Sequence, residues 1–599
     1  MNTFLSGLDF ARARLIPGAV LIALYALVAA GAPFGDPIRV LIAVLALAFW
    51  PGTMLLRFLL VEREIEWPGR TAYGFVLGIG LASAFALTAH VLRFDYGAGT
   101  WALPLIGLLL ACVRPPRAVQ APDPRGLLPW VLLAAWALLM AAVFGTLGAP
   151  LMSNTDSPDH IATLRRMIDT REVFPLDAFF VDTGLFGADP RKGLYHAWVA
   201  IVSRASHVDP VATWQILPLV LIPTFVIAIY ASTYALTESR MTGVMAAVLF
   251  PLLYGGGPGG TELREAVYST RVGEVVALLA VAALVRYVER GHVRRLGLFW
   301  ATAWTAIAIH IWYSLYLAIG LGIYAVGVAL ARRNGTEIRR LAGAFAGLVA
   351  LAGPYLVFRM RSSTGPSNVI HTEPQGLLHL TDRLFVVDPS AVWAWNGIWL
   401  VVALAAAPWL WSRRHISTGA IYLALVPAAV VAMVFNPWLV PVLEAKLGYL
   451  TMRLIWIAPV IPIVALLFVR LSEVYVRGHG RARALAGAGV VAALFLLVPS
   501  VQQAASVVLE RDRLLATEEA RGPEPYRDLL SFLSTHYRER RVFLSDPATS
   551  YAIPAYTGHA VSAYLDQHSS PNDPKGLERI LDARDALSPY VGMDSTLAI

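Results

Sequence analysis

The feature that most constrains this chain is a long succession of apolar stretches separated by short basic or polar segments. A membrane-spanning helix needs about 20 mostly apolar residues, and about fifteen stretches of the sequence reach or approach that length. They are 15–32, 38–60, 71–92, 99–113, 127–147, 211–236, 241–254, 273–289, 296–311, 312–331, 341–358, 393–411, 417–435, 452–471 and 485–505. The sequence therefore predicts an all-α polytopic membrane bundle of about 15 spans, because helices satisfy their own backbone hydrogen bonds in lipid.

The composition agrees with a membrane protein and excludes a water-soluble enzyme. Of the 599 residues, 57% are hydrophobic and only 15% are charged, and the mean hydropathy is +0.61. Soluble domains have about 25% charged residues. The net charge of +8 does not indicate nucleic acid binding, because the basic residues lie in short clusters between apolar stretches. The single cysteine, Cys112, excludes an intramolecular disulfide.

The arginine clusters predict how the chain is oriented. Arginine and lysine mark cytoplasmic loops, and their alternation places the N-terminus inside and the C-terminus outside. Lysine is almost absent whereas arginine and alanine are abundant, as in proteins of GC-rich bacterial genomes, so we expect the inner (cytoplasmic) membrane of a bacterial cell. This alternation holds only if 196–208 does not span, so we expect an interfacial helix on the outer surface there. We interpret 1–120 as an N-terminal transmembrane module and 121–505 as the transmembrane core, with the large outer loop 148–209.

The last segment, 506–599, differs from the rest of the chain. Its charged residues are about twice as dense as those of the preceding 505 positions. Its pattern alternates between helix and strand, which predicts a small α/β extracytoplasmic domain. No closing strand follows the last one predicted, so we expect this domain to be truncated at its C-terminal end.

The outer loop 148–209 begins with an acidic group that is the best candidate for catalysis. Asp156, Asp159 and His160 lie within five residues, just past the end of a predicted span. Asp156 or Ser157 could simply cap the helix that follows. At the membrane edge, however, a carboxylate is suited to take a proton from an attacking hydroxyl. The same three side chains could hold a divalent metal such as Mg²⁺ or Mn²⁺, although their spacing is not a specific metal signature.

Several cations and histidines at outer span ends are candidates for binding substrate or phosphate. Two cations and a histidine occur together in the sequence ADPRKGLYH, where binding of membrane lipid headgroups is the alternative. A glycine-rich loop, GGGPGGTELREAVYSTR, lacks the Lys-Ser/Thr ending of a nucleotide-binding loop. A cationic side chain at the end of a membrane-spanning helix is a functional candidate, although it can also extend toward the lipid headgroups. The candidates are Arg191, Lys192, His196, Glu262, Arg264, Arg271, His310 and Arg453.

With many spans, an acidic residue at the start of the first large outer loop, and a soluble tail, the chain resembles the GT-C fold integral-membrane glycosyltransferases. Protein mannosyltransferases and the lipid A aminoarabinose transferase are members of that group. The resemblance covers roughly 127–505 and the tail in outline. The chain departs from it in its extra N-terminal spans and in its acidic sequence Asp-Ser-Pro-Asp-His, where Asp-Glu is common.

The resemblance implies transfer of a sugar from a polyprenyl-phosphate carrier to an extracytoplasmic glycan, lipid or protein acceptor, with inversion. By position, Asp156 or Asp159 would be the base, and Arg271, Arg453 and His310 would stabilise the leaving phosphate. Two alternatives remain at the level of sequence. One is a transporter or flippase for a lipid-linked sugar, in which internal repeats and midplane charges are expected. The other is a non-catalytic scaffold for cell-envelope assembly, which would not need the acidic pair.

Overall fold

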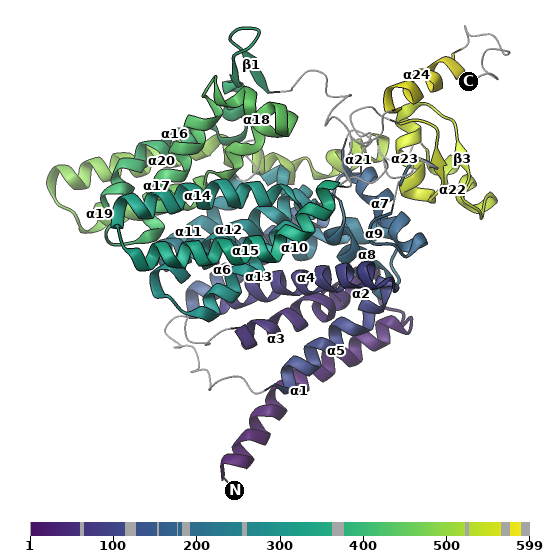
Figure 1. Cartoon of the computed structure of the whole chain (residues 1–599), viewed down its shortest axis with the longest axis horizontal. Coiled ribbons are helices and arrows are strands. Elements are labelled where there is room, and N and C mark those ends of the chain that lie inside the picture. Colours follow the sequence, from purple (N-terminus) through teal and green to yellow (C-terminus); the bar gives the residue numbers. More distant parts are fainter. Residues whose placement is uncertain are drawn as a thin grey trace.

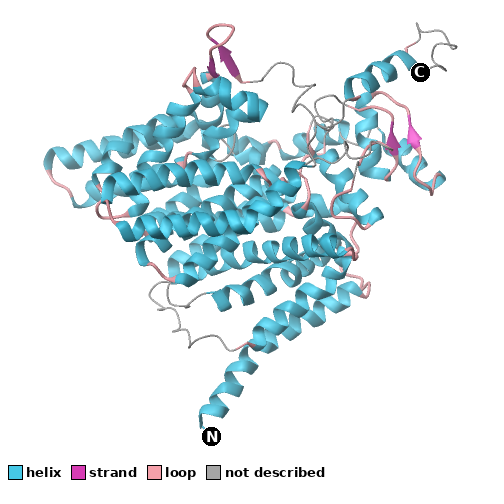
Figure 2. Ribbon diagram, viewed as in Figure 1, coloured by secondary structure: helices cyan, strands magenta, loops and turns pink. Residues whose placement is uncertain are grey.

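A computed structural model describes residues 2–59, 65–113, 127–151, 155–175, 178–181, 192–253, 260–361, 376–521, 526–564 and 575–588. Within these ranges, side chains are not described for 2–15, 127–128, 260–262, 449, 517–521 and 576–577. Each of the fifteen predicted apolar stretches lies largely on one or more helices (Figures 1 and 2). The prediction of an all-α membrane bundle is therefore confirmed.

The N-terminal helices occupy the lower part of Figure 1, and close backbone contacts join them. A Cβ atom at Gly78 would lie 2.0 Å from the carbonyl oxygen of Ala48, so only glycine lets these two helices approach so closely. The elements are α1 (Asn2–Ala29), α2 (Asp36–Val44), the π-helical η1 (Leu45–Phe49), α3 (Trp50–Leu59), α4 (Trp67–Leu92), η2 (Tyr96–Ala98) and α5 (Gly99–Cys112).

The remaining transmembrane helices lie side by side, with α12 almost completely buried among them. The elements up to α14 are α6 (Leu127–Phe144), η4 (Gly145–Leu147), α7 (Ser157–Thr170), α8 (Leu194–Ser206), α9 (Pro210–Ile216), α10 (Pro218–Thr237), α11 (Arg240–Leu253), η6 (Gly260–Val267), α12 (Ser269–Arg290), α13 (Val293–Ile309) and α14 (Trp312–Arg332). They are followed by α15 (Gly335–Arg361), the antiparallel hairpin β1 (Leu377–His379) and β2 (Phe385–Val387), α16 (Pro389–Ser412), α17 (Thr418–Val434), α18 (Leu439–Leu447), η7 (Gly448–Ile457), α19 (Val460–Arg477) and α20 (Gly480–Leu509).

Fewer helices meet a strict criterion for a span than the sequence suggests. In the described part of the chain, nine helices are long and apolar enough to cross a membrane, or ten if the pair α17 and α18, bent by 87°, counts as one span. Three shorter apolar helices correspond to predicted spans as well: Ile16–Ala29, Tyr96–Cys112 and Arg240–Leu253. The two predicted spans not accounted for in this way, 273–289 and 296–311, lie on α12 and α13. Both helices carry charged residues near their ends.

The predicted interfacial helix at 196–208 has a different environment from the one expected. It forms α8, whose residues from Leu194 to Ser203 are all buried. Helices α2 and α4 pack on one part of it and α7 on another. Because helices of the N-terminal module cover α8, it lies inside the protein and not on its surface. The first spans are thus integrated with the helices that carry the outer loop.

The C-terminal segment forms the predicted alternation of helices and strands, seen at the right of Figure 1 next to α7. Strands β3 and β4 pair in parallel. The elements are α21 (Arg511–Arg521), α22 (Arg527–His536), β3 (Val542–Phe543), α23 (Pro547–Thr557), β4 (Ala560–Val561) and α24 (Gly576–Ala586).

Candidate functional site

The acidic turn lies at the start of α7. Pro158 occupies the first turn of the helix, where its fixed φ and missing N–H are tolerated. Asp156 is the N-cap residue by position, but its side chain makes no capping hydrogen bond, and the residue is exposed. The capping explanation considered for Asp156 therefore does not account for its carboxylate.

Asp159, in the first turn of α7, has a different environment. Its carboxylate contacts the ammonium group of Lys192, and the side chains of both residues are only 13% exposed. An adjacent cation favours the ionised form of a carboxylate. Lys192, which we expected to bind phosphate, is thus the ion-pair partner of Asp159 and ties α7 to the start of α8.

His160 and His196 form a buried pair. His160 Nδ1 lies 2.7 Å from His196 Nε2, and the backbone N–H of Gly193 donates to His196 Nδ1 at 3.3 Å. If both rings are neutral, these contacts assign the His196 proton to Nε2, which donates to His160. The His160 ring also stacks on Trp214, with 5.1 Å between centroids. The two histidines predicted as separate candidates are therefore adjacent, and they hold α7 against α8.

Tyr268 connects the acidic turn to the next outer loop. Its hydroxyl lies 3.0 Å from the Ser157 hydroxyl, to which Trp214 Nε1–H donates at 3.1 Å. Burial, together with the carboxylates of Glu265 and Asp156, raises the pKa of Tyr268 above its usual value, so its hydroxyl stays protonated at neutral pH. Sequence reasoning missed Tyr268, because a single tyrosine near a span end has no pattern that separates it from core aromatics.

Arg271 follows Tyr268 at the N-terminus of α12. Its backbone N–H donates to the Tyr268 carbonyl oxygen at 3.0 Å, and its guanidinium group donates to Glu265 at 3.4 Å. The Arg271 and Arg453 guanidinium groups lie 5.4 Å and 5.1 Å from the centroid of the same indole ring, that of Trp456. Two cations that are 182 positions apart in the sequence therefore share one aromatic partner.

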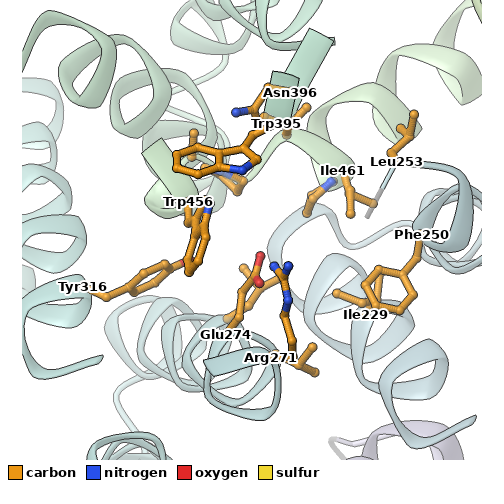
Figure 3. Close-up of a pocket in the computed structure, with 16 residues that line it drawn as sticks. Ile229, Phe250, Leu253, Arg271, Glu274, Tyr316, Trp395, Asn396, Trp456 and Ile461 are labelled. Atoms are coloured by element: carbon orange, nitrogen blue, oxygen red, sulfur yellow. The ribbon is translucent and has the colours of Figure 1, made fainter. Parts of the chain in front are cut away.

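A cavity opens beside this indole ring and encloses about 720 Å³ of space that is partly open to solvent. Figure 3 shows Arg271 and Glu274 side by side, pointing into the cavity from α12, with Trp456 and Trp395 across from them. Apolar side chains form much of the remaining wall, among them Ile229, Phe250, Leu253, Leu278 and Ile461. Glu274 was missed by sequence reasoning, although a carboxylate within an apolar stretch is a signal that could have identified it.

The other candidates do not line this cavity, and the side chains of two of them lie outside the described part of the structure. His310 caps the end of α13, where its Nδ1 accepts the backbone N–H of Trp312 at 3.1 Å. Its ring meets the edge of Tyr313, a residue within electrostatic reach of Arg271 and Arg453. Buried Arg264 donates to the Gly148 carbonyl at 3.2 Å and so links two outer loops. Arg191 and the side chain of Glu262 are outside the described residues.

The described side chains contain no group of three or more His, Cys, Asp or Glu residues that could hold a metal ion. Asp159 contacts Lys192, and one nitrogen of His160 contacts His196. Within the described residues, two of the three side chains considered as metal ligands thus have protein partners.

The C-terminal domain packs directly against the acidic turn. The Tyr551 hydroxyl donates to the Thr155 carbonyl at 3.1 Å, and burial together with the Asp159 and Asp156 carboxylates raises the pKa of Tyr551. Arg165 of α7 donates to the Ala555 carbonyl at 2.9 Å. The Phe179 ring stacks on Tyr564, with 4.1 Å between centroids. The domain therefore borders the candidate catalytic residues.

No family model and no curated protein matches this chain. Among solved structures, ArnT from Cupriavidus metallidurans bound to undecaprenyl phosphate is similar over 80% of this chain and 95% of its own, with 16% identity and a TM-score of 0.46. The archaeal oligosaccharyltransferase AglB from Archaeoglobus fulgidus, in complex with an inhibitory peptide and a dolichol-phosphate, is similar over 73% of this chain and 65% of its own, with 11% identity and a TM-score of 0.42.

Proposed function

We propose that this chain is a membrane glycosyltransferase that moves a sugar from a polyprenyl-phosphate carrier to a hydroxyl group of an extracytoplasmic acceptor. One observation carries the proposal. Ser157, next to Asp156, contacts Tyr268, and the Tyr268 carbonyl accepts the backbone N–H of Arg271. The exposed carboxylate of Asp156 is therefore linked through Ser157 and Tyr268 to Arg271, which lines the cavity together with Glu274 and apolar side chains.

We assign a role to each side chain of the candidate site from its exposure and its charge. Asp156 takes the proton of the acceptor hydroxyl as its oxygen attacks the anomeric carbon. The bond between that carbon and the phosphate oxygen breaks, and the electron pair leaves with the polyprenyl phosphate. A single displacement of this kind inverts the anomeric centre. Arg271 and Arg453 stabilise the negative charge that develops on the phosphate.

The cavity suits a lipid-linked donor better than a nucleotide sugar. Arg271 in its wall provides charge-assisted hydrogen bonds for a phosphate, and Arg453 lies against the same Trp456 ring, while the isoleucine, leucine and phenylalanine side chains of the wall suit an isoprenoid chain. A donor that arrives within the bilayer needs no glycine-rich nucleotide loop, and the glycine-rich loop here lacks the residues of one.

Binding of undecaprenyl phosphate to the purified full chain, followed by native mass spectrometry, tests the donor site. Losing one charge-assisted contact is worth roughly 1.5–3 kcal/mol, so Arg271→Gln and Arg453→Gln should each weaken binding about tenfold or more. Arg413→Gln is the matched control, because Arg413 lies 4.6 Å from the centroid of Trp409, away from the cavity residues. Parental binding in both cavity variants would contradict the assignment of the phosphate site.

A further inference from the structure

A second cavity lies at the opposite end of α12 from the first. It encloses about 620 Å³ of space that is partly open to solvent, and its wall includes Glu66, Tyr230, Arg286, Arg290 and Arg295. Arg271 and Arg290 are 19 positions apart on one helix, which corresponds to about 28 Å at 1.5 Å per residue. The two cavities therefore lie near opposite faces of the membrane, and the orientation predicted from the arginine clusters places the second on the cytoplasmic side.

The charged side chains in the wall of this second cavity carry a net positive charge. Its wall contains three guanidinium groups, of Arg286, Arg290 and Arg295, and one carboxylate, that of Glu66. The Glu66 carboxylate accepts from the Tyr230 hydroxyl at 2.7 Å and from Arg240 at 2.5 Å.

Two further carboxylates approach the same arginines from outside the wall. Glu238 contacts Arg286 and Arg290, but its side chain is 57% exposed. Glu289 contacts Arg286 at 3.1 Å and also accepts from the hydroxyl and the backbone N–H of Thr418. Neither carboxylate is among the residues of the cavity wall, and Arg295 is only 6% exposed. A buried guanidinium group in a cavity wall favours an anionic occupant.

The rest of the wall is apolar and is built by membrane-spanning helices. Ile65, Ala231, Ala235, Ala283 and Leu298 contribute small or aliphatic side chains. Helices α4 and α10 belong to candidate spans, so their ends lie where lipid headgroups meet the hydrocarbon layer. Large exposed apolar residues begin three of the neighbouring helices, namely Trp67, Met241 and Val293. Tryptophan is enriched at this depth of a bilayer.

We propose that this second cavity binds the phosphate of an anionic membrane lipid. The phosphate is held by Arg286, Arg290 and Arg295, and the acyl chains leave along the apolar wall toward the bilayer. The cavity is shared by α4 of the N-terminal module and by α10, α12 and α13 of the core. A lipid bound there would join the two parts of the chain. This inference is independent of the proposed transferase activity.

The test uses the purified full chain in a neutral detergent, with phosphatidylglycerol, phosphatidylcholine and inorganic phosphate as probes in native mass spectrometry and thermal unfolding. We expect phosphatidylglycerol to bind and to raise the unfolding temperature, with a much smaller effect of the other two probes. Arg290→Gln and Arg295→Gln should each weaken phosphatidylglycerol binding about tenfold. Arg477→Gln is the control, since Arg477 is an exposed arginine at the corresponding end of α19 and should bind as the parent does.

A second variant keeps the test decisive if Arg295→Gln does not fold. Ala235→Phe should fill part of the cavity without changing its charge and should weaken phosphatidylglycerol binding to a similar extent. Equal binding of phosphatidylglycerol and phosphatidylcholine would overturn the proposal. So would parental binding in Ala235→Phe and Arg290→Gln, or equal stabilisation by inorganic phosphate, which would indicate a site for a free anion.

Discussion

Replacing each aspartate of the acidic turn by asparagine should separate the two residues into a catalytic and a structural one. Asn is nearly isosteric with Asp and still caps a helix, but it does not accept a proton at neutral pH. Asp156 is exposed and makes no capping hydrogen bond with its side chain. We expect Asp156→Asn to lower turnover by about 10²–10⁴-fold, the usual contribution of a general base, with unchanged unfolding temperature.

Asp159→Asn should act mainly on stability. Its ion pair with Lys192 has both side chains only 13% exposed, so little solvent screening is expected. Removing one partner of a buried pair leaves the other charge uncompensated, at a cost of about 3 kcal/mol. We expect a large part of that loss to be recovered in the double variant Asp159→Asn/Lys192→Met, which removes both charges.

Turnover is measured with purified protein in liposomes, using a panel of polyprenyl-phosphate sugars, and stability is measured by thermal unfolding in detergent. If these assignments are right, Asp156→Asn has a lower turnover and an unchanged unfolding temperature. Asp159→Asn has a lower unfolding temperature as its main effect. Near-parental turnover in Asp156→Asn would refute the base assignment and favour the transporter or scaffold alternative. Lost turnover in the stable double variant would instead assign a catalytic role to Asp159 or Lys192.

Three further results are expected. Ser157→Ala removes the acceptor of the buried Trp214 N–H and the contact to Tyr268. The free energy of unfolding, measured by chemical denaturation, should fall by about 1–3 kcal/mol. An unchanged free energy would show that this contact does not hold the acidic turn. Tyr551→Phe removes the hydrogen bond to the Thr155 carbonyl, which is worth about 1 kcal/mol. Hydrogen exchange around residues 155–159 should therefore increase. Unchanged exchange would mean that the C-terminal domain does not order the turn. Reporter fusions after residues 180 and 560 should both indicate the extracytoplasmic side, and a cytoplasmic signal at 560 would contradict the predicted orientation.

The order of the long helices could be predicted from the sequence alone. Apolar length is a local property, and this is why each of the fifteen predicted stretches lies on helix. Local composition likewise predicted the helix–strand alternation of the C-terminal domain, which the structure contains. The turn Asp156–Ser157–Pro158 could be read as a helix start because proline and carboxylate preferences act within one turn.

Only the tertiary structure decided which of these residues meet. The contact of Lys192 with Asp159 and the shared position of Arg271 and Arg453 at Trp456 depend on how distant helices pack. Tyr268 and the burial of α8 were not predicted, because hydropathy does not tell a helix covered by protein from one covered by lipid or headgroups. Helix formation is governed by interactions within a few residues, whereas the site is built from segments 33 to 182 positions apart, whose contacts exist only after the bundle has packed.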